Sequence, residues 1–161
     1  MPLTTDIARF LCSDFQPSAQ AFEIARRGTI DALAVMLAGR QEHTVLTVQE
    51  YVRSHQEGQR PCSALLEPRV CGARHAALLN GVAAHVLDYD DVAPIGHPSA
   101  VLVPALLAAG ETMEADGRAF LEAYIAGYEA WDSRQPRKRA GGKLRQHDQG
   151  LSHRPCGGLR Y

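Results

Sequence analysis

The sequence predicts an all-α fold, in which a helical, bundle-like domain is followed by a disordered or irregular C-terminal tail. Apolar residues recur at helical spacing through most of residues 1–131, and no segment there alternates between apolar and polar residues as a half-buried strand would. After Trp131 this periodicity ends, and glycines and prolines interrupt residues 132–161. We therefore divide the chain into a helical domain, residues 1–131, and a basic tail of low order, residues 132–161.

Residues 18–38 give the strongest helix signal. Pro17 is suited to the first turn of a helix, where its missing N–H costs nothing, and Gly39 is suited to a left-handed C-terminal cap. From Ile30 to Ala38, Asp31 is the one polar residue. This half of the helix is therefore expected to be buried on all sides.

The next two segments are less uniform. Residues 43–55 place valines near helical spacing, but their β-branched side chains leave a strand open as the alternative. Residues 57–72 contain two glycines and two prolines, which predict a loop with a short extended piece at residues 63–66.

Three helices are expected in the remainder of the domain. The alanine-rich residues 73–87 predict the first of them. A polar segment, residues 88–97, separates it from a helix that begins at Pro98 and that Pro104 must kink or restart. Asp116 is expected to cap the last helix, in which aromatic residues recur every four positions.

The net charge is small but unevenly distributed. The 161 residues include 17 Lys/Arg and 18 Asp/Glu, of which residues 132–161 hold 8 and 2, a net of +6. The remaining residues hold 9 and 16, a net of −7. The near-neutral total argues against a strongly basic nucleic-acid-binding protein. The longest apolar run, residues 100–109, is about half the length of a membrane-spanning helix.

Cysteine usage and the N-terminus point to a cytoplasmic protein. The four cysteines form no Cys-x-x-Cys pair, which argues against a disulfide framework or a zinc ribbon. Asp6 and Arg9 precede any apolar stretch, so no secretory signal pattern is recognised.

The side chains best suited to catalysis or metal binding cluster near the end of one predicted helix and in the polar segment that follows it. His85, Asp88, Asp90 and Asp91 are followed by His97. Three carboxylates this close would repel one another if all were desolvated, so one is expected to gain a proton or to pair with a cation such as protonated His97. A positioned Asp–His pair is commonly used by enzymes for proton transfer.

Two other interpretations of these residues stay open. The aspartates can simply cap a helix end and solvate a turn, with His85 a packed helix residue. Alternatively, His85, Asp88, Asp90 and His97 are of residue types that bind metal ions, although their spacing matches no recognised motif.

The segments Leu79 to Asp91 and Gly96 to Ala105 together resemble the MmgE/PrpD family, which includes 2-methylcitrate dehydratase and cis-aconitate decarboxylase. They read Leu-Asn-Gly-Val-Ala-Ala-His-Val-Leu-Asp-Tyr-Asp-Asp and Gly-His-Pro-Ser-Ala-Val-Leu-Val-Pro-Ala. Residues 31–39 and 123–129 resemble helices of the same family. The resemblance covers about residues 15–131.

The resemblance implies a lyase that uses no metal or organic cofactor and removes water or carbon dioxide from small di- or tricarboxylates by proton transfer next to a carboxylate. Members combine a large helical domain, which this chain resembles in part, with a smaller lid domain, and are typically homodimers. The catalytic positions of the family correspond here to Asp88 and His97. We expect Asp90, Asp91 and Ser99 to support the substrate site.

The sequence also departs from the family pattern. Val92 stands where many members have a threonine, and no Lys or Arg lies between Arg74 and Arg118 to hold substrate carboxylates. Where the family reaches a Gly-Phe-His-Pro-Thr-type segment, residues 150–155 read Gly-Leu-Ser-His-Arg-Pro. We therefore expect a truncated member that is inactive or weakly active, with residues 132–161 translated out of frame or otherwise replacing the continuation.

Two non-catalytic functions are the alternatives. In the first, the chain is an interaction remnant whose helices dimerise through exposed apolar faces. In the second, the basic tail binds an acidic partner or nucleic acid around Arg137–Arg139. Three adjacent cations without interleaved aromatic residues are weak support for this, so we favour a solvated, unstructured tail and expect no nucleic-acid binding.

Overall fold

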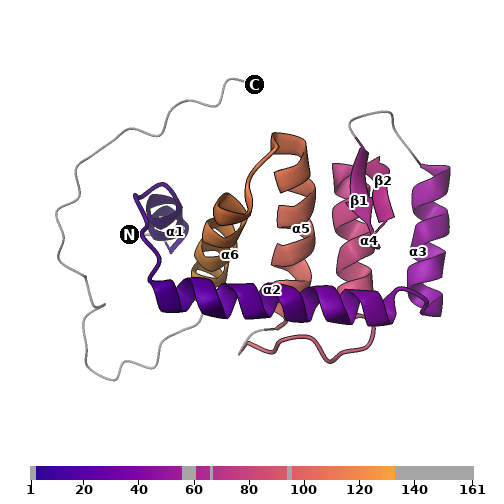
Figure 1. Ribbon diagram of the computed structural model, residues 1–161, viewed down its shortest axis with the longest axis horizontal. Helices are drawn as coiled ribbons and strands as arrows, with labels where there is room; N and C mark the ends of the chain where they lie inside the picture. Colours follow the sequence, from indigo (N-terminus) through magenta and orange to yellow (C-terminus); the bar gives the residue numbers. More distant parts are fainter. Residues whose placement is uncertain (1–2, 56–60, 66, 94–95, 133–161) are drawn as a thin grey trace.

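The computed structural model describes residues 3–55, 61–65, 67–93 and 96–132 and consists of helices with one small hairpin (Figure 1). The helices are α1 (Leu3–Leu11), α2 (Ala19–Gly39), α3 (His43–Ser54), α4 (Ala73–His85), α5 (Pro98–Met113) and α6 (Gly117–Asp132). Strands β1 (Pro61–Ala64) and β2 (Glu67–Gly72) pair antiparallel. The predicted all-α class is confirmed, while the tail lies outside the described residues.

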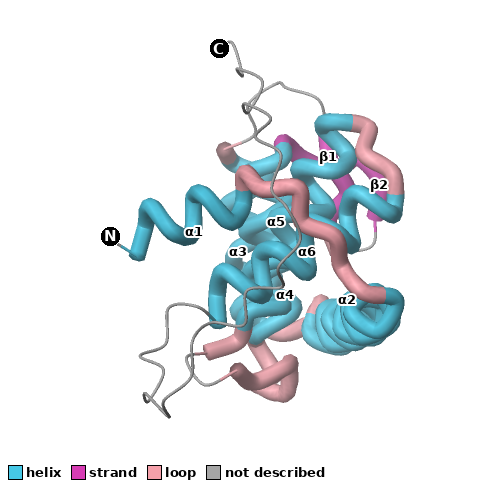
Figure 2. The backbone as a smooth tube through the Cα atoms, turned by 90° about the vertical axis from the view of Figure 1, so that its left-hand side faces the viewer, coloured by secondary structure: helices cyan, strands magenta, loops and turns pink. Residues whose placement is uncertain are grey.

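Helices α4 and α5 form the centre of the domain. Helix α3 and the hairpin pack against α4, and α6 packs against α5. Helix α2 runs across α4, α5 and α6 in Figure 1 and contacts all three; it is seen nearly end on in Figure 2. The core has two clusters, one around Met36, Val45 and Leu79 and the other around Ala25, Val103 and Tyr124.

Helix α2 begins at Ala19, one residue after the predicted start at residue 18. The Oγ of Ser18 accepts a hydrogen bond from the N–H of Ala21 at 3.2 Å, so Ser18 is the cap and Pro17 lies outside the first turn. The expected burial of the second half on all sides is wrong, because Ile30 is 60% exposed and Leu37 is 44% exposed. Seven residues apart, these two side chains share one side of the helix.

The predicted left-handed cap at Gly39 is also wrong. Gly39 is the last residue of α2, and the right-handed conformation continues into Arg40, which has φ −57°. A Cβ on Gly39 would overlap the carbonyl oxygen of Ala83 and lie 2.7 Å from Cγ1 of Val86. The glycine is therefore required by the close packing of α2 on α4.

The structure decides between helix and strand for residues 43–55 and corrects the loop that was expected after them. Residues 43–54 are helical rather than extended. The expected loop contains a hairpin, and its first strand covers residues 61–64 rather than the predicted 63–66. The register pairs Cys62 with Cys71, and both side chains are buried. Burial raises the pKa of the Cys71 thiol. Helix α1 was not predicted, although Leu3, Ile7 and Phe10 recur in it at helical spacing; none of its residues is buried.

The last two helices follow their predicted signals. Helix α5 begins at Pro98 and runs through Pro104 without restarting. The N–H of Ala119 donates to Oδ1 of Asp116 at 2.8 Å, which confirms the predicted cap of α6. No helix in the described part of the chain is both long and apolar enough to cross a membrane.

Candidate functional site

The connection between α4 and α5 brings four of the singled-out side chains together. His85 is the last residue of α4, and His97 directly precedes Pro98 at the start of α5. The backbone turns at Asp88, which has φ 54° and whose N–H donates to the carbonyl of His85 at 2.9 Å. As a result, the centroids of the two imidazole rings are only 4.5 Å apart.

Asp90 lies between the two imidazoles with its side chain only 1% exposed. Its Oδ1 is 3.0 Å from Nδ1 of His85, a hydrogen bond, and its Oδ2 is 3.3 Å from Nδ1 of His97. The second contact is not aligned as a hydrogen bond, so this buried Nδ1 has no hydrogen-bond partner among the described residues. One buried carboxylate thus contacts both imidazoles.

Asp88 has the opposite environment, with its side chain 78% exposed. Its Oδ1 lies 3.7 Å from Nε2 of His97, somewhat longer than a hydrogen bond. The ring of His97 therefore has one nitrogen beside the buried Asp90 and the other beside the exposed Asp88. The structure brings the two predicted catalytic residues, Asp88 and His97, next to each other.

Asp91 and Ser99 make hydrogen bonds within the fold. Asp91 accepts from the N–H of Ser99 through Oδ1, at 3.1 Å, and from the hydroxyl of Tyr128 through Oδ2, at 3.0 Å. The hydroxyls of Ser99 and Tyr124 lie 2.5 Å apart in the interior. Burial, followed by the hydrogen bond to Asp91, raises the pKa of Tyr128 far above its ordinary value. The predicted substrate-supporting role of Asp90, Asp91 and Ser99 stays a prediction.

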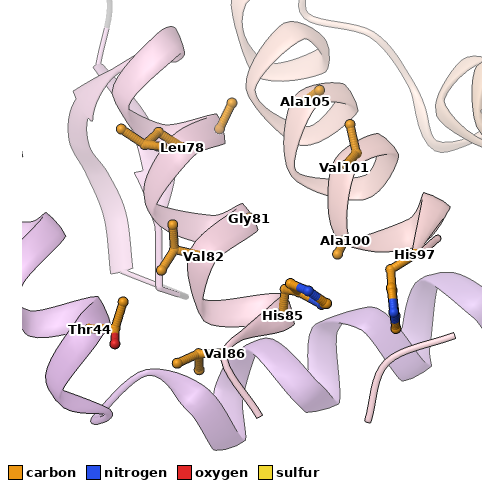
Figure 3. Close-up of a pocket in the computed structure, with 11 residues that line it drawn as sticks. Thr44, Leu78, Gly81, Val82, His85, Val86, His97, Ala100, Val101 and Ala105 are labelled. Atoms are coloured by element: carbon orange, nitrogen blue, oxygen red, sulfur yellow. The ribbon is translucent and has the colours of Figure 1, made fainter. Parts of the chain in front are cut away.

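An apolar groove of about 560 Å³ runs between α4 and α5, with the two imidazoles at one end (Figure 3). Leu78 and Val82 line it from α4, and Ala100 and Val101 line it from α5. The described residues around this groove include no Lys or Arg. The groove walls therefore offer no Lys or Arg to a substrate carboxylate, and the titratable side chains that line the groove are the two imidazoles.

The same four residues could also hold a metal ion. One ligand atom each from His85, Asp88, Asp90 and His97 lies within 4.8 Å of all the others. Two imidazoles and two carboxylates suit Zn²⁺, whose tetrahedral ligands at about 2.0–2.1 Å are about 3.3 Å apart. The cluster would have to contract to that spacing. The metal interpretation stays open, and the expectation of no metal stays a prediction.

Sequence reasoning missed the structural role of Asn80. Its Oδ1 accepts from the N–H of Leu65 at 2.7 Å, and its Nδ2 donates to the carbonyl of Ser63 at 3.1 Å. This buried amide fastens the hairpin to α4. A single amide within an alanine- and leucine-rich helix was the available signal, since a buried polar side chain is normally hydrogen-bonded.

Comparison with known families confirms the resemblance. The chain matches the family model of the MmgE/PrpD N-terminal domain over residues 5–151, a range that includes the whole α4–α5 connection. The match extends on both sides of the residues 15–131 for which the sequence motifs showed the resemblance. The division at residue 132 stays a prediction. No curated protein matches the chain.

Proposed function

Because this chain belongs to the MmgE/PrpD family, we propose that it contributes catalytic residues to a lyase that acts on small di- or tricarboxylates. The proposed reaction is dehydration or decarboxylation by proton transfer next to a carboxylate. One observation supports this most strongly. Nε2 of His97, a residue that lines the groove, lies 3.7 Å from the exposed carboxylate of Asp88.

In this mechanism Nε2 of His97 takes the proton from the substrate carbon next to a carboxylate. A substrate carbon placed beside Nε2 of His97 also lies within reach of Asp88. The imidazolium formed when Nε2 takes the proton lies between Asp88 and Asp90, whose negative charges stabilise it.

The two reactions differ in which bond then breaks. In dehydration, the electron pair of the C–H bond becomes the new double bond, the C–O bond breaks, and the leaving hydroxyl takes a proton from the His97 imidazolium to become water. In decarboxylation, carbon dioxide leaves, its electron pair stays on carbon, and His97 or Asp88 delivers a proton to that carbon.

The substrate carboxylates need cations that this site does not contain. No Lys or Arg lies between Arg74 and Arg118 in the sequence, while three aspartates lie within residues 88–91. In the proposed enzyme the cationic groups come from outside this segment. We therefore propose that the chain by itself binds its substrate weakly and reacts slowly, since positioning supplies much of the rate of an enzyme.

Proton exchange tests this function. The chain is incubated with 2-methylcitrate or cis-aconitate in D₂O with EDTA present, since no metal is expected to take part, and NMR follows deuterium incorporation next to the carboxylates. We expect slow exchange by the wild type and a loss of at least about 10-fold in His97→Gln, because the proton acceptor is removed. The exposed His43→Gln is the matched control and should retain the wild-type rate.

Binding is measured in the same samples from the NMR signals of His97. The proposal predicts that millimolar substrate shifts these signals and leaves those of His43 in place. It is contradicted if neither acid shifts the His97 signals, or if exchange proceeds at the same rate in His97→Gln.

A further inference from the structure

Asp90 is the one acidic residue that is buried within the described part of the chain. A buried carboxylate is stable only when its charge and its acceptor oxygens are satisfied. The ion-pair partners of Asp90 are the imidazoles of His85 and His97: Nδ1 of His85 contacts both carboxylate oxygens, and Nδ1 of His97 contacts Oδ2. The chemistry of this carboxylate is therefore set by those two rings.

The tautomers of the rings follow from these contacts. An ionised carboxylate only accepts hydrogen bonds, so an imidazole nitrogen that bonds to it must carry a hydrogen. Nδ1 of His85 already makes this bond at 3.0 Å. Nδ1 of His97 is buried without a hydrogen-bond partner among the described residues, and Oδ2 of Asp90 lies 3.3 Å away. Buried polar atoms are almost always paired, and a small rotation of this ring would complete a hydrogen bond to Oδ2.

We propose that Asp90 is a positioning residue that holds His85 and His97 in the Nδ1–H tautomer. Nε2 of His97 is then unprotonated and available on the side of Asp88, where the substrate proton arrives. This assignment rests on the proposed function of His97, whereas the tautomers themselves can be measured without any substrate.

His85 has a part in the same arrangement. Its Nδ1 contacts Oδ1 at 3.0 Å and Oδ2 at 3.3 Å, which holds the carboxylate with Oδ2 beside His97. Its ring also packs against that of His97, with an angle of 54° between the ring planes. His85 thus acts through Asp90 and is itself a second positioning residue.

Nitrogen NMR of the chain labelled with ¹⁵N-histidine tests the tautomers directly. Spectra are recorded without substrate at about pH 8, where free histidine is neutral, and His85→Gln and His97→Gln assign the signals. We expect Nδ1–H for both rings in the wild type. Asp90→Asn keeps the size of the side chain but replaces one acceptor oxygen with a donor NH₂. It should therefore convert one of the two rings to Nε2–H.

Asp91→Asn is the matched control, because Asp91 lies in the same connection but bonds to Ser99 and Tyr128 instead. It should leave both tautomers unchanged. An Nε2–H tautomer of His97 in the wild type would overturn the proposal. So would unchanged tautomers in a folded Asp90→Asn. If circular dichroism shows that Asp90→Asn does not fold, the wild-type tautomer decides alone.

The exchange assay separates this proposal from the proposed function. Asp90→Asn should lower kcat for exchange by about 10–100-fold and change KM by less than about 3-fold, because it misorients the proton acceptor and does not touch the substrate. A larger effect on KM than on kcat contradicts a positioning role. If the tautomers are as expected but the wild type neither binds nor exchanges either acid, the proposed function fails while the assignment of the rings stands.

Discussion

At the scale of single residues, Asp88 and Asp90 show how one motif holds two different carboxylates. They are two residues apart, yet their side chains are 78% and 1% exposed. The left-handed turn at Asp88 directs one toward solvent and the other into the space between the imidazoles. Carboxylates in such different environments are suited to different tasks. In the proposed mechanism Asp88 meets the substrate and Asp90 orients the ring.

Tyr128 provides a prediction about pH. An unfolded tyrosine loses its proton from about pH 10, whereas burial and the contact with Asp91 raise the pKa of Tyr128 in the folded state. Above about pH 10 the folded state therefore binds more protons than the unfolded state, and the free energy of unfolding falls as the pH rises. Tyr128→Phe should reduce this fall by up to about 1.4 kcal/mol per pH unit.

Urea unfolding between about pH 7 and pH 11 measures this effect. At neutral pH the same variant should be less stable by about 1–2 kcal/mol, because the hydrogen bond to Asp91 is lost. Tyr51→Phe, at a half-exposed tyrosine, is the control and should keep the wild-type pH dependence. If the free energy of unfolding falls equally steeply above about pH 10 in Tyr128→Phe and in the wild type, the fold does not raise the pKa of Tyr128.

Sequence reasoning found the residues of the site but not their contacts. Asp88 and His97 follow from a motif within one short segment, so a pattern in the sequence was enough to select them. The bond between Asp91 and Tyr128 joins residues 37 positions apart and depends on how α6 packs against α5. The burial of Asp90 depends on a backbone turn. Neither feature leaves a local pattern in the sequence.

At the scale of elements, the long helices were predictable and the short elements were not. Helices α2, α4, α5 and α6 carry apolar periodicity over 13 residues or more. The strands have only 4 and 6 residues, too few for a clear alternation. Gly39 was correctly expected at the end of α2, but for the wrong reason. A glycine can be required either by a left-handed cap or by a close contact between helices, and the sequence does not distinguish the two.

Gly39→Ala separates those two causes. If Gly39 serves close packing, the added methyl overlaps the carbonyl of Ala83, and the free energy of unfolding should fall by about 1–3 kcal/mol. Gly110→Ala in α5 is the matched control, because the nearest atom to its added Cβ, on Ala115, is 4.0 Å away. It should leave the protein as stable or raise its stability by up to about 1 kcal/mol. Thermal and urea unfolding measure both, and an equal gain from both substitutions would contradict the packing role.

At the scale of the whole molecule, α2 has an apolar side that the described structure leaves uncovered. Helix α2 lies at the edge of the domain in Figure 2. Ile30 and Leu37 are exposed there, although α2 also packs on the core through Ala32, Val35 and Met36. Because the sequence resemblance implies a homodimer, we propose that a second copy of the chain covers Ile30 and Leu37.

Sedimentation and light scattering at several protein concentrations test the dimer. We expect a dimer at micromolar concentration, and at least about a 10-fold weaker association in the double variant Ile30→Glu/Leu37→Glu, because charges would be buried at the interface. Met113→Glu is the control, since Met113 is 76% exposed at the end of α5 and does not belong to the apolar side of α2. Circular dichroism establishes that both variants keep their helices. A wild type that stays monomeric at every concentration would rule out the dimer, and an unweakened double variant would place its interface on another surface.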